Sequence, residues 1–101
     1  MEIELPVDQT RTYTWLPPDL AVTLGLRRIG TCTFETSRGR IATRALAQVT
    51  LSADGVSRPA TVVLCEPGDP AAWGVTSLEM LGLSVDGGEV RRSEGLLGLE
   101  A

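Results

Sequence analysis

Histidine and lysine are both absent from this 101-residue sequence, and aromatic residues make up only 4% of it. Without an imidazole, the chain cannot build a Ser-His-Asp triad, a Cys-His pair or the usual catalytic zinc site. No GxxxxGKS, GxxxxGKT or GxGxxG motif that would hold a nucleotide phosphate occurs either. Chemistry is therefore left to carboxylates, arginine, hydroxyl groups and cysteine, and we expect no cofactor.

Cysteine is scarce as well. The two cysteines, Cys32 and Cys65, lie in apolar stretches and lack CxxC spacing. A free buried cysteine behaves as a small apolar side chain, whereas metal-binding cysteines usually come in closely spaced pairs. We therefore expect two buried free thiols and no metal site, with a disulfide as the less favoured alternative.

Long apolar runs and basic clusters are also lacking. The apolar runs are far shorter than the roughly 20 residues that span a bilayer. Residues 1–4 lack the basic and apolar regions of a signal peptide. The formal net charge is −4 and the nine basic residues are scattered, so no surface for phosphates is predicted. These features favour a cytoplasmic protein that binds neither membranes nor nucleic acids.

The length and composition suit one globular domain. Apolar residues make up 43% of the chain and charged residues 22%, and both are spread along it. A chain of this length normally has one hydrophobic core. We therefore expect a single domain over residues 1–101.

Alternation and turn residues predict several strands. Apolar residues alternate with polar ones up to Asp8, which is typical of a half-buried strand. Residues 29–51 are rich in β-branched side chains and are interrupted at 36–40, so they predict a hairpin. A second hairpin is predicted around the turn at 53–55, and its apolar return strand, 60–65, should lie inside the sheet.

Two short helices and a last hairpin complete the prediction. A helix should begin at Pro17-Pro18 and end at Gly25, because proline suits the first helical turn and glycine the end. A second helix is predicted from the spacing of apolar residues in 75–81, ended by Gly82. The segment 83–92 predicts a small hairpin with a Gly-Gly turn.

Motifs at both ends of the chain resemble those of one protein family. A predicted strand ends in Val7-Asp8. It is followed by residues 12–17, which contain the pair Leu-Pro, and by residues 20–26, which read LAVTLGL. Residues 74–86 read GVTSLEMLGLSVD. In this order they resemble the bacterial retropepsin-like aspartic proteases, which read VDTGAT, then LP and LAxxLGL, and later LGxxxLExLGLxVD. The resemblance covers about residues 2–92.

The resemblance implies a mainly β fold, namely a small closed antiparallel barrel with one or two short helices. One helix would pack behind the active-site loop. Two copies of the chain would form a homodimer in which their catalytic aspartates meet across a twofold axis. Family members usually carry about one more strand or hairpin before this loop, and residues 1–101 would lack it.

By the same resemblance, Asp8 stands at the position of the catalytic aspartate. Two such carboxylates share one proton, so that one activates water and the other protonates the carbonyl. The family continues with Thr or Ser, Gly and a small residue, whereas this chain has Gln9, Thr10 and Arg11. Thr10 adds bulk where the backbones should approach, and the cation of Arg11 favours an ionised Asp8. We therefore expect weak or no protease activity.

Several of these residues have two interpretations. Asp8 is favoured as a turn-forming aspartate that bonds nearby amides, with catalysis as the alternative. The segment Arg38-Gly39-Arg40 resembles the tip of the flap that covers substrate in the family, although glycine suits any tight turn. Trp15 and Trp73 each abut a helix, which favours packing in the core or at its rim over a role as ligand platforms. By the resemblance, Trp73 would also fill the space where its segment crosses behind the active-site loop.

Two functions of different classes follow. The favoured one is an interaction or assembly module that keeps a groove for a peptide or protein ligand under its flap. The alternative is an aspartic endopeptidase, active as a homodimer, in which Asp8 of each subunit activates water for peptide-bond hydrolysis. A small β domain unrelated to proteases is a third possibility.

Overall fold

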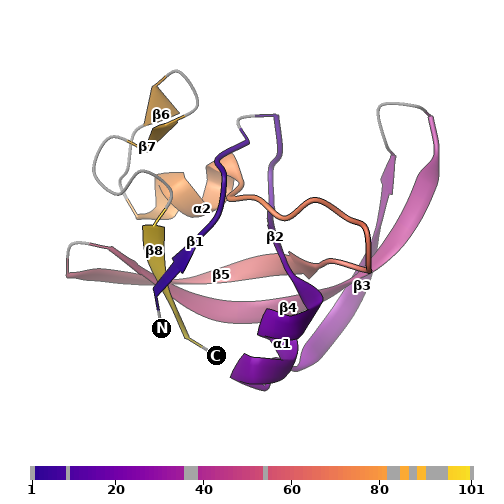
Figure 1. The fold of residues 1–101 in the computed structure, drawn as a ribbon, viewed down its shortest axis with the longest axis horizontal. Coiled ribbons are helices and arrows are strands. Elements are labelled where there is room, and N and C mark those ends of the chain that lie inside the picture. Colours follow the sequence, from indigo (N-terminus) through magenta and orange to yellow (C-terminus); the bar gives the residue numbers. More distant parts are fainter. Residues whose placement is uncertain are drawn as a thin grey trace.

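The main feature of the fold is one six-stranded sheet (Figure 1). The computed structural model describes residues 2–8, 10–35, 39–53, 55–81, 85–86, 89–90 and 96–100. The elements are β1 (Glu2–Glu4), β2 (Thr14–Leu16), α1 (Pro18–Leu24), β3 (Arg28–Glu35), β4 (Ile41–Ala53), β5 (Val56–Leu64), α2 (Val75–Met80), β6 (Val85–Asp86), β7 (Glu89–Val90) and β8 (Leu96–Glu100). The fold is mainly β with two short helices, as the sequence predicts.

The long strand β4 is the centre of the sheet. Its first part pairs antiparallel with β3, and its second part pairs with β5 along one edge and with β8 along the other. The order β1-β8-β4-β5-β2 continues the sheet on both sides. The predicted hairpins β3–β4 and β4–β5 are confirmed, and β5 lies inside the sheet between β4 and β2.

The predicted closed barrel is not confirmed. The two ends of the strand order, β1 and β2, do not pair with each other in the part of the chain that the structure describes. Each has only three residues. Closing a barrel requires strands that are long enough to keep their hydrogen bonds at a common tilt and stagger. The described sheet is therefore open.

The core lies on one face of this sheet. Along β4 the residues Ala45, Ala47, Val49 and Leu51 are buried, while their neighbours in sequence are more exposed. This period of two is what a sheet with one buried face requires. Residues from β2, α1, β5, α2 and β8 and from the segments on either side of α2 complete the core: Leu16, Leu20, Ala60, Val62, Trp73, Leu78, Leu81 and Leu99.

The ends of α1 follow from its sequence. Proline occupies its first turn, where a missing N–H costs nothing. Gly25 ends the helix at φ +64°, and the amide of Leu26 donates to the carbonyl of Ala21 at 3.0 Å. This left-handed ending favours glycine because a Cβ would be strained there. The predicted helix is therefore confirmed at both ends.

The sequence did not predict β2 or β8. β2 has three residues, and it pairs in parallel with β5, so neither a turn nor an alternating pattern marks it. β8 lies beyond the last predicted hairpin and joins β1 to β4. No described helix has both the length and the apolar content needed to cross a membrane.

Candidate functional site

A cleft of about 790 Å³ lies between three segments that are distant in the sequence. The first is the loop from Asp8 to β2, the second is the hairpin β3–β4, and the third contains Asp69 and Pro70. The hairpin and β2 are separate parts of the fold in Figure 1. The volume of the cleft is in the range of ordinary ligand sites.

A crossing segment holds the ends of the Asp8 loop together. Trp73 bridges to Val7 in parallel, and Ala72 bridges to Trp15 in antiparallel orientation. The Asp8 amide donates to the Trp73 carbonyl at 3.1 Å, and the Trp15 amide donates to the Ala72 carbonyl at 2.9 Å. The segment thus lies between the backbone that enters the loop and the backbone that leaves it.

The next residue of this segment, Gly74, has no room for a side chain. A Cβ at this position would lie 2.3 Å from the carbonyl carbon of Tyr13. The Gly74 amide donates to the hydroxyl of Thr14 at 2.9 Å, and that hydroxyl donates to Ser77 at 2.7 Å. Both hydroxyl residues are buried, so the bonds satisfy groups that water cannot reach. The close backbone contact fixes the base of the loop.

The carboxylate of Asp8 is bound within its own loop. Oδ1 accepts hydrogen bonds from the Thr10 amide at 2.9 Å and from the Thr10 hydroxyl at 2.6 Å. Oδ2 lies 3.1 Å from Nε of Arg11. These contacts, the Thr10 hydroxyl first and the Arg11 charge among the smaller ones, lower the pKa of Asp8. The geometry is that of an aspartate that closes its own turn.

Arg11 connects the loop to the rest of the cleft. Its Nη1 donates to the carbonyl of Pro70 at 2.5 Å, while Nε contacts Asp8. The guanidinium carbon lies 5.4 Å from the ring centre of Trp15, which is within cation–π range. The sequence predicted a cation beside Asp8, but the contacts with Pro70 and Trp15 depend on the fold.

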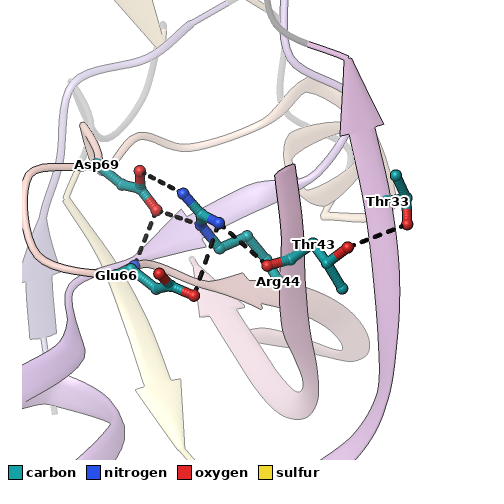
Figure 2. Close-up of polar contacts among 5 residues, drawn as sticks. All are labelled: Thr33, Thr43, Arg44, Glu66 and Asp69. Atoms are coloured by element: carbon teal, nitrogen blue, oxygen red, sulfur yellow. Dashed lines mark hydrogen bonds and ion pairs between the residues drawn. The ribbon is translucent and has the colours of Figure 1, made fainter. Parts of the chain in front are cut away.

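A second arginine–aspartate pair, Arg44 and Asp69, lines another wall of the cleft, and Figure 2 shows its polar contacts. Arg44 donates to Asp69 through Nε at 2.6 Å and through Nη2 at 3.0 Å. Asp69 also accepts the amide of Glu66 at 2.8 Å, and Nη1 of Arg44 lies 3.6 Å from the Glu66 carboxylate. Hydrogen bonds to Arg44 are the largest cause that lowers the pKa of Asp69.

This second pair attaches the loop after β5 to the hairpin. Arg44 lies on β4 next to the buried Ala45, on the face turned away from the core. Asp69 is 25 residues further along the chain. No short-range pattern links such residues, so the sequence did not identify them. An arginine in an amphipathic strand and an aspartate in a proline–glycine loop were the only available signals.

Three aromatic rings form the apolar part of the cleft. The ring of Phe34 on β3 lies 5.1 Å from that of Trp15 and 6.3 Å from that of Tyr13. Tilted and edge-on contacts of this kind add to the stability gained from burial. Trp15 is half-buried and lines the cleft, whereas Trp73 is fully buried in the core. Packing in the core is therefore confirmed for Trp73 and packing at the rim for Trp15, although Trp15 also lines the cleft.

The predicted flap tip is only partly described. Arg38 and the loop residue Gln9 lie outside the described residues. Gly39 adopts φ +75° and is exposed, as a tight turn requires, and Arg40 is exposed. Neither Gly39 nor Arg40 lines the cleft, whereas Phe34 and Glu35 of the same hairpin do. A contact between the tip and a ligand stays a prediction.

Both cysteines are free thiols. Cys65 is buried, and burial raises the pKa of its thiol to about 11. Cys32 is half-buried on β3. The prediction of free thiols is confirmed, and that of burial holds for Cys65. In the described residues, no group of three or more acidic or cysteine side chains is arranged to hold a metal ion.

Comparison of the chain with protein-family models, with curated proteins and with solved structures gives no match. The function is therefore inferred from the sequence motifs and from the geometry of the cleft.

Proposed function

We propose that this chain is a retropepsin-like domain that holds an extended peptide in its cleft and does not cleave it. The sequence motifs support the family, and the arrangement of the loop agrees with them. The crossing segment at residues 72–74 lies behind the Asp8 loop, and a long β-hairpin faces that loop across the cleft. Both features are what the resemblance leads one to expect.

The observation that carries the proposal is the state of Asp8. An aspartic protease needs two carboxylates that share a proton, so one of them must have a raised pKa. Here the hydroxyl and amide of Thr10 and the guanidinium of Arg11 surround the carboxylate, and its pKa is lowered. Those contacts favour an ionised Asp8 whose carboxylate is already bound by Thr10 and Arg11.

The remaining walls suit a peptide. The rings of Tyr13, Trp15 and Phe34 supply apolar surface, and polar side chains surround them. Sites that bind peptides typically combine such pockets with a nearby strand that an extended chain can lie along. The hairpin β3–β4 provides strands beside this cleft.

One observation favours the alternative function, an endopeptidase that is active as a homodimer. Asp8 lines the cleft, and its side chain is 35% exposed, so a substrate would reach it. In that case Asp8 of each subunit would contribute to one active site, and Thr10 and Arg11 would have to release it.

Cleavage of casein between about pH 3 and 7 separates the two functions, because general acid–base catalysis needs an ionisable group at Asp8. The proposal predicts equally low cleavage by the wild-type chain and by Asp8→Asn. It also predicts that the immobilised protein retains members of a random peptide library and returns them intact. Cleavage that is lost in Asp8→Asn would establish the endopeptidase. Failure to retain any peptide above a blocked support would overturn peptide binding.

A further inference from the structure

The charged side chains that line the cleft differ in whether an opposite charge lies beside them. Its two guanidinium groups already have partners: Arg11 binds Asp8 and the carbonyl of Pro70, and Arg44 binds Asp69 in a two-pronged contact. Their side chains are only 21% and 16% exposed. An anionic ligand would therefore have to displace an existing carboxylate to reach either cation.

Glu35 differs from the other two carboxylates in the lining. It follows Phe34 at the end of β3, and it is exposed. It forms neither an ion pair nor a side-chain hydrogen bond with any residue in the described part of the chain. Asp8 and Asp69 are paired with their arginines, so Glu35 is the carboxylate of the lining that has no arginine beside it in the described residues.

We infer that the cleft selects peptides that carry a lysine or arginine next to an aromatic or aliphatic residue. The basic side chain would pair with Glu35, and the apolar side chain would pack on Phe34 and Trp15, which contact each other. The formal charge of −4 on the whole chain adds a long-range attraction for such peptides. The inference rests on the proposed function, because it concerns the ligand of the same cleft.

The experiment uses a library of blocked, randomised octapeptides and the immobilised full chain. Retained peptides are sequenced by mass spectrometry for the wild type, Glu35→Gln, Glu35→Lys and Glu79→Gln. The last variant removes the same charge from α2, outside the cleft, and so controls for net charge. Glu35 and Glu79 are both exposed, so none of these changes should prevent folding.

The wild type and Glu79→Gln should retain basic over acidic peptides by about two- to fivefold, the range expected of one exposed ion pair. Glu35→Gln should abolish this preference, and Glu35→Lys should reverse it. Peptide binding with no charge preference, or with a preference that Glu35→Gln leaves intact, would overturn the inference and keep the proposed function. Failure of every protein to retain peptides would overturn both.

Discussion

Two arginine–aspartate pairs face the same cleft, and they differ in almost every respect. Asp8 and Arg11 are three residues apart, meet through one contact of 3.1 Å, and belong to one loop. Arg44 and Asp69 are 25 residues apart, meet through two hydrogen bonds of 2.6 and 3.0 Å, and join the hairpin to the loop after β5. The contact between Asp8 and Arg11 sets the state of one carboxylate, whereas the contact between Arg44 and Asp69 connects two parts of the fold.

The difference shows how one kind of interaction serves two purposes. A two-pronged arginine–carboxylate contact is stronger and more directional than a single one. Exposed pairs contribute little to stability, because water and salt screen the charges and holding both side chains in one geometry costs entropy. We therefore expect the loss of Asp69 to affect folding and the loss of Asp8 to affect mainly the chemistry of the cleft.

The largest effect should come from the segment on which the Asp8 loop rests. Gly74→Ala places a Cβ within 2.3 Å of the Tyr13 backbone, so the crossing segment must move. We expect a loss of about 3 kcal/mol in the free energy of unfolding, measured by urea denaturation. Gly30→Ala is the matched control, because a Cβ at Gly30 meets no atom within 4 Å. Equal stability of both variants would contradict the close contact.

The next effect compares the two aspartates directly. Asp69→Asn removes the negative charge and one of the two oxygens that accept two guanidinium hydrogen bonds and one amide hydrogen bond, and should lower the free energy of unfolding by about 1 to 2 kcal/mol. Asp8→Asn should lower it by about 0.5 kcal/mol or less, because its side chain is more exposed and its partners are local. A larger loss for Asp8→Asn than for Asp69→Asn in the same denaturation series would reverse the comparison.

The same contrast explains what the sequence could predict. The ends of α1 depend on Pro18 and Gly25, and the hairpins depend on turns a few residues long, so local patterns were sufficient. The sequence also predicted that the cation of Arg11 lies beside Asp8. By contrast, Arg44 and Asp69 meet only because β4 and β5 pair, and β2 is defined only by its parallel partner. Contacts of this kind require the register of distant strands, which no local pattern contains.

Acid should weaken the fold through both aspartates. Each has its folded pKa lowered below its ordinary value of 3.8, so each stabilises the folded state above that pH. This stability is lost as the pH falls through the lower, folded pKa. The melting temperature should therefore fall between about pH 4 and 2. Asp69→Asn should flatten that fall more than Asp8→Asn does, and an unchanged slope in Asp69→Asn would contradict the account.

The smallest effect is expected at Arg11. Arg11→Gln should change the free energy of unfolding by about 0.5 kcal/mol or less, while Arg44→Gln, which loses the connection between hairpin and loop, should be clearly less stable. Thermal unfolding under one set of conditions compares them. Because Arg11 lies over Trp15, Arg11→Gln should also shift the fluorescence of that ring. An Arg11→Gln protein as unstable as Arg44→Gln would show that the first pair is structural too.

Nuclear magnetic resonance of the labelled protein with retained library peptides tests the central claim most directly, because the two indole N–H signals report on different places. Trp15 lines the cleft and Trp73 is buried in the core. The account predicts that the peptides shift the Trp15 indole and the amides of Phe34 and Arg44, leave the Trp73 indole in place, and are recovered uncut. Bound peptide that leaves the Trp15 signal unchanged, or peptide recovered as fragments, would contradict it.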